Sequence, residues 1–211
     1  MPGGEVVVGV AGASGGLLAK RFVELALTCG QLSELHLVVS EPALQVAREE
    51  IDRGIATPAD WLDRIDRPPG GIARVVLHGN DRFDAPIASG SYPVAGMVVI
   101  PCSAGTLGAI ANGISRDLLQ RAADVCLKER RPLVLAFRES PYSLVHIENM
   151  RKATMAGAIV APPSPAFYIG SPSMDRFLDA YCARLARWVG LEVPGEDFAW
   201  RGPSPGGPLR S

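Results

Sequence analysis

The chain has 211 residues, of which 47% are hydrophobic and 20% are charged, and its formal net charge is −1. This length fits one domain with a full core, and the near-neutral charge gives no overall field that favours nucleic acid or an anionic membrane. No apolar run is long enough to span a bilayer, and the amino terminus lacks the basic region of a signal peptide. The four cysteines are scattered without CxxC spacing, which is typical of reduced cysteines in a cytoplasmic protein.

The first elements expected are a β-branched strand over residues 5–10, the sequence AGASGG, and a helix that ends near Gly30. A strand, a glycine-rich turn and a helix start together can hold a phosphate on backbone N–H groups. The spacing is not GxGxxG, however, so a dinucleotide fingerprint is excluded. A tight turn between strand and helix explains these glycines equally well.

The next segment predicts a strand over residues 35–39 that ends at Ser40, and a helix from Pro42 to about Gly54. A short helix over residues 58–65 and a strand over residues 74–77 follow. Residues 80–91 form a surface loop, whose small residues at 88–91 either merely permit the turn or wrap a flat ligand.

Residues 97–139 show the pattern on which the rest of the chain is organised. An apolar strand over residues 97–100 is followed by a loop of small residues at 103–106. A mostly apolar helical stretch then runs to the charged residues 128–131, and a strand over residues 133–137 ends on Arg138 and Glu139. Small residues and charges at strand ends are not explained by core packing, so they indicate a ligand.

The remaining pattern predicts a helix over residues 143–156, a short strand over 158–161, and a last helix capped by Ser173. Strands that alternate with helices predict an α/β fold with a parallel sheet covered on both faces. In such sheets ligands bind at the carboxyl ends of the strands, which is where Ser14, Ser40, Ser103 and Arg138 fall. Residues 1–193 form the expected domain, and residues 194–211 form a proline- and glycine-rich tail.

The chemistry-bearing residues favour an anionic ligand over a metal. Arg121 and Lys128 lie two turns apart on one predicted helix face, although a solvated basic face is the common reason for such a pair. The three histidines are not paired in sequence with a carboxylate or with one another, so structural roles are expected for them. Cys102 follows a strand end, but nothing in the sequence supplies a base that would make it a nucleophile.

Several longer motifs resemble those of the UbiX-type flavin prenyltransferases, formerly described as aromatic-acid decarboxylase subunits. The resemblance covers residues 6–191 and rests on GASG at 12–15, ASGS at 88–91, PCSAGTLGAIANG at 101–113, LLQRAADVCLKERRPLVLAFRE at 118–139, HIENM at 146–150 and PPSPAFY at 162–168. The segments at 101–113 and 118–139 are long and specific.

The resemblance implies a flavodoxin-like, Rossmann-like three-layer fold, FMN binding without a metal, and assembly into a homododecamer. It implies a transferase that joins the dimethylallyl group of dimethylallyl monophosphate to N5 and C6 of reduced FMN. The product, prenylated FMN, would serve a UbiD-type decarboxylase. The sequence contains no DDxxD motif to hold Mg²⁺, so cationic side chains would stabilise the leaving phosphate.

The resemblance also implies roles for individual residues. Glu50 and Glu139 should transfer protons, with Glu50 protonating the leaving phosphate. Ser14 should form a hydrogen bond near N5 of the flavin. FMN contacts are expected from Gly12, Ala13, Ser14, Ser40, Ser89, Ser103, Thr106 and Arg138. The substrate residues expected are Phe83 beside the prenyl group, Arg121 across a subunit contact, and Lys128, Arg138, Tyr168 and Arg184 on the phosphate.

The sequence alone is compatible with two other functions. An FMN-dependent decarboxylase of cysteine-derived substrates would share the architecture, but it has no reason to keep Lys128, Arg138 and Arg184 together. A non-catalytic flavin carrier that delivers FMN to a decarboxylase would need the flavin loops but not Glu139.

Overall fold

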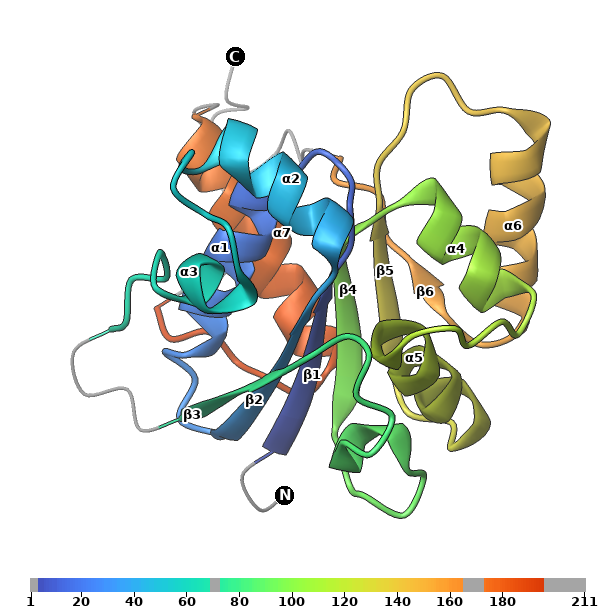
Figure 1. Cartoon of the computed structure of the whole chain (residues 1–211), viewed down its shortest axis with the longest axis horizontal. Helices are drawn as coiled ribbons and strands as arrows, with labels where there is room; N and C mark the ends of the chain where they lie inside the picture. Colours follow the sequence, from blue (N-terminus) through green and yellow to red (C-terminus); the bar gives the residue numbers. More distant parts are fainter. Residues whose placement is uncertain (1–3, 69–72, 165–172, 196–211) are drawn as a thin grey trace, which may run out of the picture.

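The computed structural model describes residues 4–68, 73–164 and 173–195. Its elements alternate between strands and helices, as the sequence predicts (Figure 1). The elements are β1 (Gly4–Val10), α1 (Gly16–Ala26), β2 (Leu32–Val39), α2 (Glu41–Glu50), α3 (Pro58–Leu62), β3 (Arg74–His78), the 3₁₀ turn η1 (Pro86–Ala88), β4 (Gly96–Cys102), α4 (Ala104–Ala111), α5 (Leu118–Lys128), β5 (Leu133–Phe137), α6 (Leu144–Met155), β6 (Ile159–Val160) and α7 (Met174–Trp188).

The six strands form one sheet in the order β3-β2-β1-β4-β5-β6, and every neighbouring pair is parallel. The order reverses direction between β1 and β4, which is the position where sheets of this type bind ligands beyond the carboxyl ends of their strands. The predicted α/β class with a parallel sheet is confirmed.

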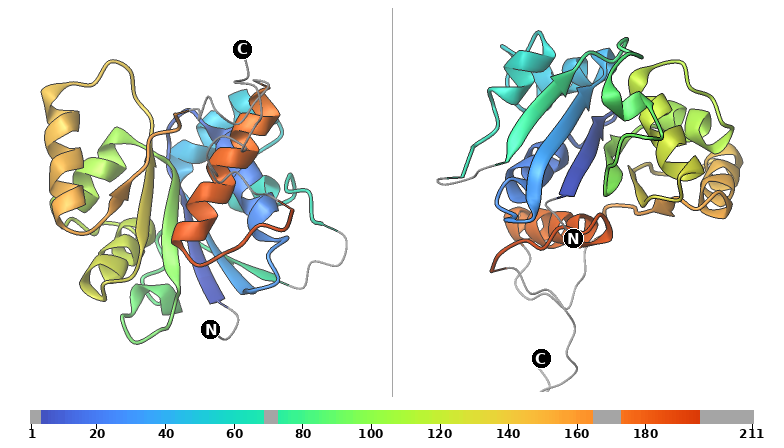
Figure 2. Two further views of the ribbon diagram at one scale, coloured as in Figure 1. Left: turned by 180° about the vertical axis from the view of Figure 1, so that it is seen from behind. Right: turned by 90° about the horizontal axis from the view of Figure 1, so that it is seen from below.

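Helices cover both faces of the sheet (Figure 2). Alternation along β1 explains the two cores, because Val6 and Val8 point to the face covered by α1 and α7, whereas Val7 points to the face with α4, α5 and α6. All three valines are almost completely buried. The strands are therefore apolar on both faces, as parallel sheets require.

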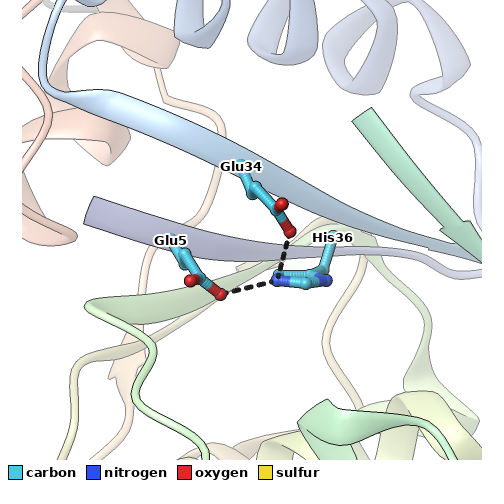
Figure 3. Close-up of side chains that lie close together, drawn as sticks. All are labelled: Glu5, Glu34 and His36. Atoms are coloured by element: carbon cyan, nitrogen blue, oxygen red, sulfur yellow. Dashed lines mark hydrogen bonds and ion pairs between the residues drawn. The ribbon is translucent and has the colours of Figure 1, made fainter. Parts of the chain in front are cut away.

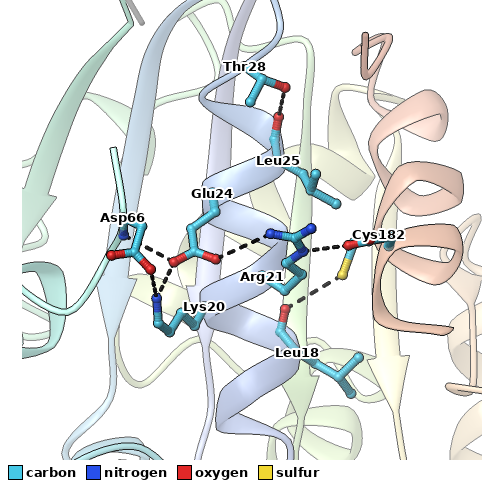
Figure 4. Close-up of polar contacts among 9 residues, drawn as sticks. Leu18, Lys20, Arg21, Glu24, Leu25, Thr28, Asp66 and Cys182 are labelled. Atoms are coloured by element: carbon cyan, nitrogen blue, oxygen red, sulfur yellow. Dashed lines mark hydrogen bonds and ion pairs between the residues drawn. The ribbon is translucent and has the colours of Figure 1, made fainter. Parts of the chain in front are cut away.

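The packing of α1 combines an apolar face with polar contacts at its edges (Figure 4). Lys20 pairs with Glu24 on the next turn and with Asp66 beyond α3. Arg21 donates to Asp179 on α7, and the Cys182 thiol lies 3.7 Å from the carbonyl oxygen of Leu18. These contacts fix α1, and hence the glycine-rich loop before it, against α7.

Three predicted boundaries are wrong. Helix α2 ends at Glu50 rather than near Gly54. Residues 103–106 are not a loop, because Ser103 caps α4 and its hydroxyl accepts from the Thr106 N–H at 3.2 Å. The single helical stretch expected before residue 128 is two helices, because Gly113 adopts φ 66° and Asp117 caps a new helix, α5.

Other expectations are confirmed or remain predictions. Ser173 caps α7 as expected, and its hydroxyl accepts from the Arg176 N–H at 3.2 Å. No helix among the described residues is long and apolar enough to cross a membrane. Most of the predicted tail, from residue 196 onward, lies outside the described residues.

Candidate functional site

A cleft of about 750 Å³ opens at the carboxyl ends of β1, β2, β4 and β5. The residues that line it come from the four strand ends at which the sequence predicts ligand contacts. The residues on the strand-end side are Gly12, Ala13, Ser14, Ser40, Pro42, Ser103, Ala104, Gly105, Thr106, Ala109, Arg138 and Glu139. The opposite side is formed by Asn80, Ile114, Arg116, Asp117 and Gln120.

Gly12 lets two of these strand ends approach each other closely. A Cβ at Gly12 would overlap the ring and backbone of Pro42, the second residue of α2. Only glycine therefore fits where the loop after β1 crosses the start of α2. This contact places Ser14 and Ser40 on the same side of the cleft.

The amino terminus of α1 does not present its amides to the cleft. The N–H groups of Gly15 and Gly16 donate to the carboxylate of Glu50, at 2.9 Å and 2.6 Å to its Oε2. Glu50 satisfies two of the N–H groups that a helix start leaves unpaired. Of the two interpretations of this loop, the structure favours a turn held within the chain over a phosphate site on these two amides.

The amino terminus of α4 differs, since it faces the cleft. Ser103 caps the helix, its hydroxyl also donates to Thr106 Oγ1 at 2.9 Å, and Ala104 and Gly105 line the cleft beside it. Backbone N–H groups at a helix start favour an anion. This arrangement can hold a phosphate group of a ligand.

Two arginines add positive charge to the same cleft. Arg138 and Arg116 are exposed, and neither guanidinium makes a hydrogen bond or ion pair with another residue in the described ranges. Glu139, beside Arg138, is half-buried and accepts the N–H of Ser140 at 3.0 Å. The cleft thus offers two cations without a partner among the described residues and two carboxylates, Glu139 and Asp117, of which Asp117 caps α5. Nothing in the sequence marked Arg116, which lines the cleft only because the chain breaks between α4 and α5.

The structure brings together only part of the predicted site. Gly12, Ala13, Ser14, Ser40, Ser103, Thr106, Arg138 and Glu139 line the cleft, whereas Glu50 lies behind the loop at Gly15. Cys102 is completely buried, which raises the pKa of its thiol and argues against a nucleophile.

Three other predicted residues gather around α5 and η1. Arg121 donates to the carbonyl oxygen of Ala88 at 3.1 Å and to Asp124 at 2.6 Å. Lys128 pairs with Glu129 at the end of α5, close to Gly90, and Ser89 is the neighbour of that glycine. Lys128 and Ser89 precede β5 and β4, so they lie toward the amino ends of the strands, away from the cleft of their own chain.

Two further predicted residues, Phe83 and Arg184, do not line the cleft, and the third, Tyr168, is not among the described residues. Phe83 is 49% exposed on the loop before η1. Arg184 lies on α7 with its guanidinium 5.3 Å from the ring centre of Trp188.

Comparison with known proteins gives consistent matches over nearly the whole chain. The family model described as Flavoprotein matches residues 1–182. The flavin prenyltransferase UbiX of Halalkalibacterium halodurans is 40% identical over 190 residues, which cover 90% of each chain.

Solved structures agree with the sequence matches. The structure of AnUbiX in complex with FMN and dimethylallyl pyrophosphate has a TM-score of 0.80 and 36% identity, and the match covers 95% of this chain and 98% of that one. A dodecameric FMN-dependent UbiX-like decarboxylase from Escherichia coli O157:H7 has a TM-score of 0.80 and 34% identity, covering 94% of this chain and all of the other.

Proposed function

The chain belongs to the UbiX family of flavin prenyltransferases, and from this premise we propose that it transfers a dimethylallyl group from dimethylallyl monophosphate to reduced FMN. The bonds formed would be those at N5 and C6 of the flavin. The observation that carries the proposal is the cleft itself, because it joins eight of the residues assigned to flavin binding or proton transfer.

The cleft suits FMN in size and in charge. Its volume of about 750 Å³ lies within the usual range for sites that hold a cofactor. The start of α4 and the guanidinium of Arg138, which has no partner in the part of the chain that the structure describes, supply N–H donors and positive charge for a phosphate group. Ser14 and Ser40, which the Gly12 contact places on the same side of the cleft, supply hydroxyl groups for the polar edge of the flavin ring.

The transfer breaks an allylic C–O bond and leaves phosphate, so negative charge grows on the leaving group. Cations fixed in place before the reaction stabilise this charge without reorganising. We assign this role to Arg138 in the cleft, together with Lys128, Tyr168 and Arg184. Glu139 takes up or returns the proton that the flavin exchanges. Glu50 is the proposed acid for the phosphate, and to reach it the carboxyl group would have to leave the N–H groups of Gly15 and Gly16 behind the cleft wall.

Lys128 and Ser89 can reach a cleft only if a neighbouring copy of the chain brings them there, and the Arg121 side chain contacts η1 instead of lining the cleft as Gln120 does. Their position on α5 and η1, away from the cleft of their own chain, supports a site shared between subunits. The relative from Escherichia coli O157:H7 is described as dodecameric. We propose the same assembly here, with these three residues completing the site of a neighbour.

The product and its destination follow from the family. We propose that prenylated FMN passes to a UbiD-type decarboxylase, and that the protein works in the cytoplasm. The four cysteines are free and buried, which fits a reducing compartment.

Anaerobic incubation of the protein with reduced FMN and dimethylallyl monophosphate tests the proposal. Mass spectrometry of the extracted flavin should show FMN heavier by one dimethylallyl unit. A parallel reaction with Glu139→Gln protein controls for non-enzymatic alkylation. Unchanged flavin mass, with FMN bound to the wild-type protein, would rule the activity out.

A further inference from the structure

A second cluster of polar side chains lies at the other end of the sheet (Figure 3). Glu5 lies near the start of β1, Glu34 lies near the start of β2, and His36 lies near the middle of β2. The exposed fraction of His36 is 2%, and among the described residues no other polar or charged one is classed as buried. The predicted function uses none of these side chains.

The strand register explains why the three side chains meet. Glu5 and Glu34 are direct partners on β1 and β2, and His36 follows Glu34 by two residues, so all three project from the same face. Carboxylates opposite each other on neighbouring strands repel, which disfavours this pairing unless a cation joins them. On the next strand Arg74 is the partner of Glu34 and supplies one positive charge for the two carboxylates.

Both carboxylates converge on one atom, Nε2 of His36. This nitrogen lies 3.0 Å from Glu5 Oε2 and 3.8 Å from Glu34 Oε2, and the three ligand atoms lie within 4.8 Å of one another. One N–H group can donate a strong hydrogen bond to only one of the two. A zinc ion at 2.0–2.2 Å from each ligand in tetrahedral geometry separates the ligand atoms by about 3.3 Å, which falls between the two distances to Nε2.

A second layer of contacts fixes the orientation of each ligand. Arg74 binds the other oxygen of Glu34, Oε1, at 2.6 Å, and the Tyr92 hydroxyl lies 3.4 Å from His36 Nε2. Nδ1 of His36 lies 3.0 Å from Nε2 of His78. Metal-binding histidines usually donate their second ring N–H to an acceptor, and in the His36 tautomer that carries its proton on Nδ1 this acceptor is His78 Nε2.

From this geometry we propose that Glu5, Glu34 and His36 bind one divalent transition-metal ion, with zinc as the best fit. Zinc takes the lone pair on Nε2 of the neutral His36 imidazole, so the single ring proton is on Nδ1 and is donated to His78 Nε2. One nitrogen and two carboxylate oxygens match the ligands that zinc takes in proteins, and water fills the fourth position. The ion would join β1 to β2 at the end of the sheet away from the flavin cleft.

The experiment titrates the full-length protein, stripped with a chelator, with Zn²⁺ in a phosphate-free buffer at pH 7. Calorimetry should give about one Zn²⁺ per chain, and the melting temperature should rise with added zinc. Glu5→Gln and Glu34→Gln should each weaken the zinc affinity by at least about tenfold, because each removes a charged ligand. Glu148→Gln, which removes a carboxylate that pairs with Arg151 on α6, is the matched control and should bind zinc as the wild type does.

His36→Gln removes the nitrogen ligand and should abolish the zinc-dependent rise in melting temperature. Because His36 is buried, circular dichroism checks that the His36→Gln protein is folded. If it is not, the Glu5→Gln and Glu34→Gln variants, at half-buried positions, provide the same test. Wild-type protein that binds no zinc with this stoichiometry would overturn the proposal. Unchanged zinc affinity in both glutamate variants would overturn it as well. Neither result bears on the flavin reaction, which is measured separately.

Discussion

The two ends of the sheet carry polar residues in opposite conditions. At the carboxyl end, the guanidinium of Arg138 and the N–H groups of Ala104 and Gly105 at the start of α4 have no partner among the described residues. At the amino end, Glu5, Glu34, His36 and Arg74 satisfy one another by hydrogen bonds and ion pairs. Unpaired groups indicate a place kept for a ligand, whereas a satisfied network indicates structure or a tightly bound ion. The contrast explains why flavin chemistry belongs to the first end.

The largest effect is expected at the cleft from Glu139→Gln. This change keeps the size and the polar contacts of the side chain but removes its ability to exchange a proton, which should lower the prenylation rate by roughly 10²–10⁴-fold. FMN binding, measured by fluorescence quenching, should be retained. A variant that turns over at the wild-type rate would support the flavin-carrier hypothesis instead.

The next effect concerns residues that lie outside the cleft of their own chain. Arg121→Ala alone should strongly reduce prenylation, because the site of a neighbouring subunit loses the cation that Arg121 is proposed to supply across the contact. Co-expression of Arg121→Ala with Glu139→Gln should restore activity, since some sites then combine an intact Arg121 from one subunit with an intact Glu139 from another.

The rescue has an internal control. Each variant co-expressed with itself should stay inactive, and native mass spectrometry should show that mixed assemblies form. Mixed assemblies without any recovered activity would indicate that each chain builds its whole site alone.

A smaller effect is expected from the close approach at Gly12. Gly12→Ala introduces a Cβ that overlaps Pro42, and the resulting shift should lower the free energy of unfolding by about 1–3 kcal/mol. Urea denaturation measures the loss. Gly30→Ala is the matched control, because a Cβ there meets nothing within 4 Å. Equal stability of the two variants would show that the loop after β1 moves away from α2 at no cost.

The smallest effect is a pH dependence at the amino end. Burial, followed by the charge of His36, lowers the pKa of His78 below its ordinary value of 6.5. His78 therefore binds a proton more readily in the unfolded chain than in the folded one. The stability that the neutral ring contributes above about pH 6.5 is lost as the pH falls through the pKa of His78 in the folded protein. The melting temperature, measured with a chelator present, should fall less between pH 7 and 5.5 in His78→Gln than in the wild type.

Much of the fold and half of the site could be predicted because they depend on short-range pattern. Apolar runs, capping residues and the alternation of strand and helix are local, and strand ends meet at one edge in any parallel sheet. Ser103 was predicted beside a ligand and lines the cleft, but its role as a helix cap was missed because small residues are typical of loops as well.

The remaining features depend on register and packing, which the sequence does not encode locally. His36 and His78 are 42 positions apart, and they meet because β2 and β3 pair with His78 two residues beyond the partner of His36. The break between α4 and α5 depends on the left-handed conformation of Gly113, which a glycine permits but does not require.

Glu50 gives the glycine-rich loop an unusual dependence on one proton. Its carboxylate accepts the N–H groups of both Gly15 and Gly16, one residue beyond Ser14 in the cleft lining. A protonated carboxyl group is a weaker acceptor, so each proton that Glu50 gains loosens the loop that carries Ser14. If Glu50 exchanges a proton during turnover, the shape of the cleft wall changes in step with the reaction. One side chain then both exchanges the proton and holds the loop in place.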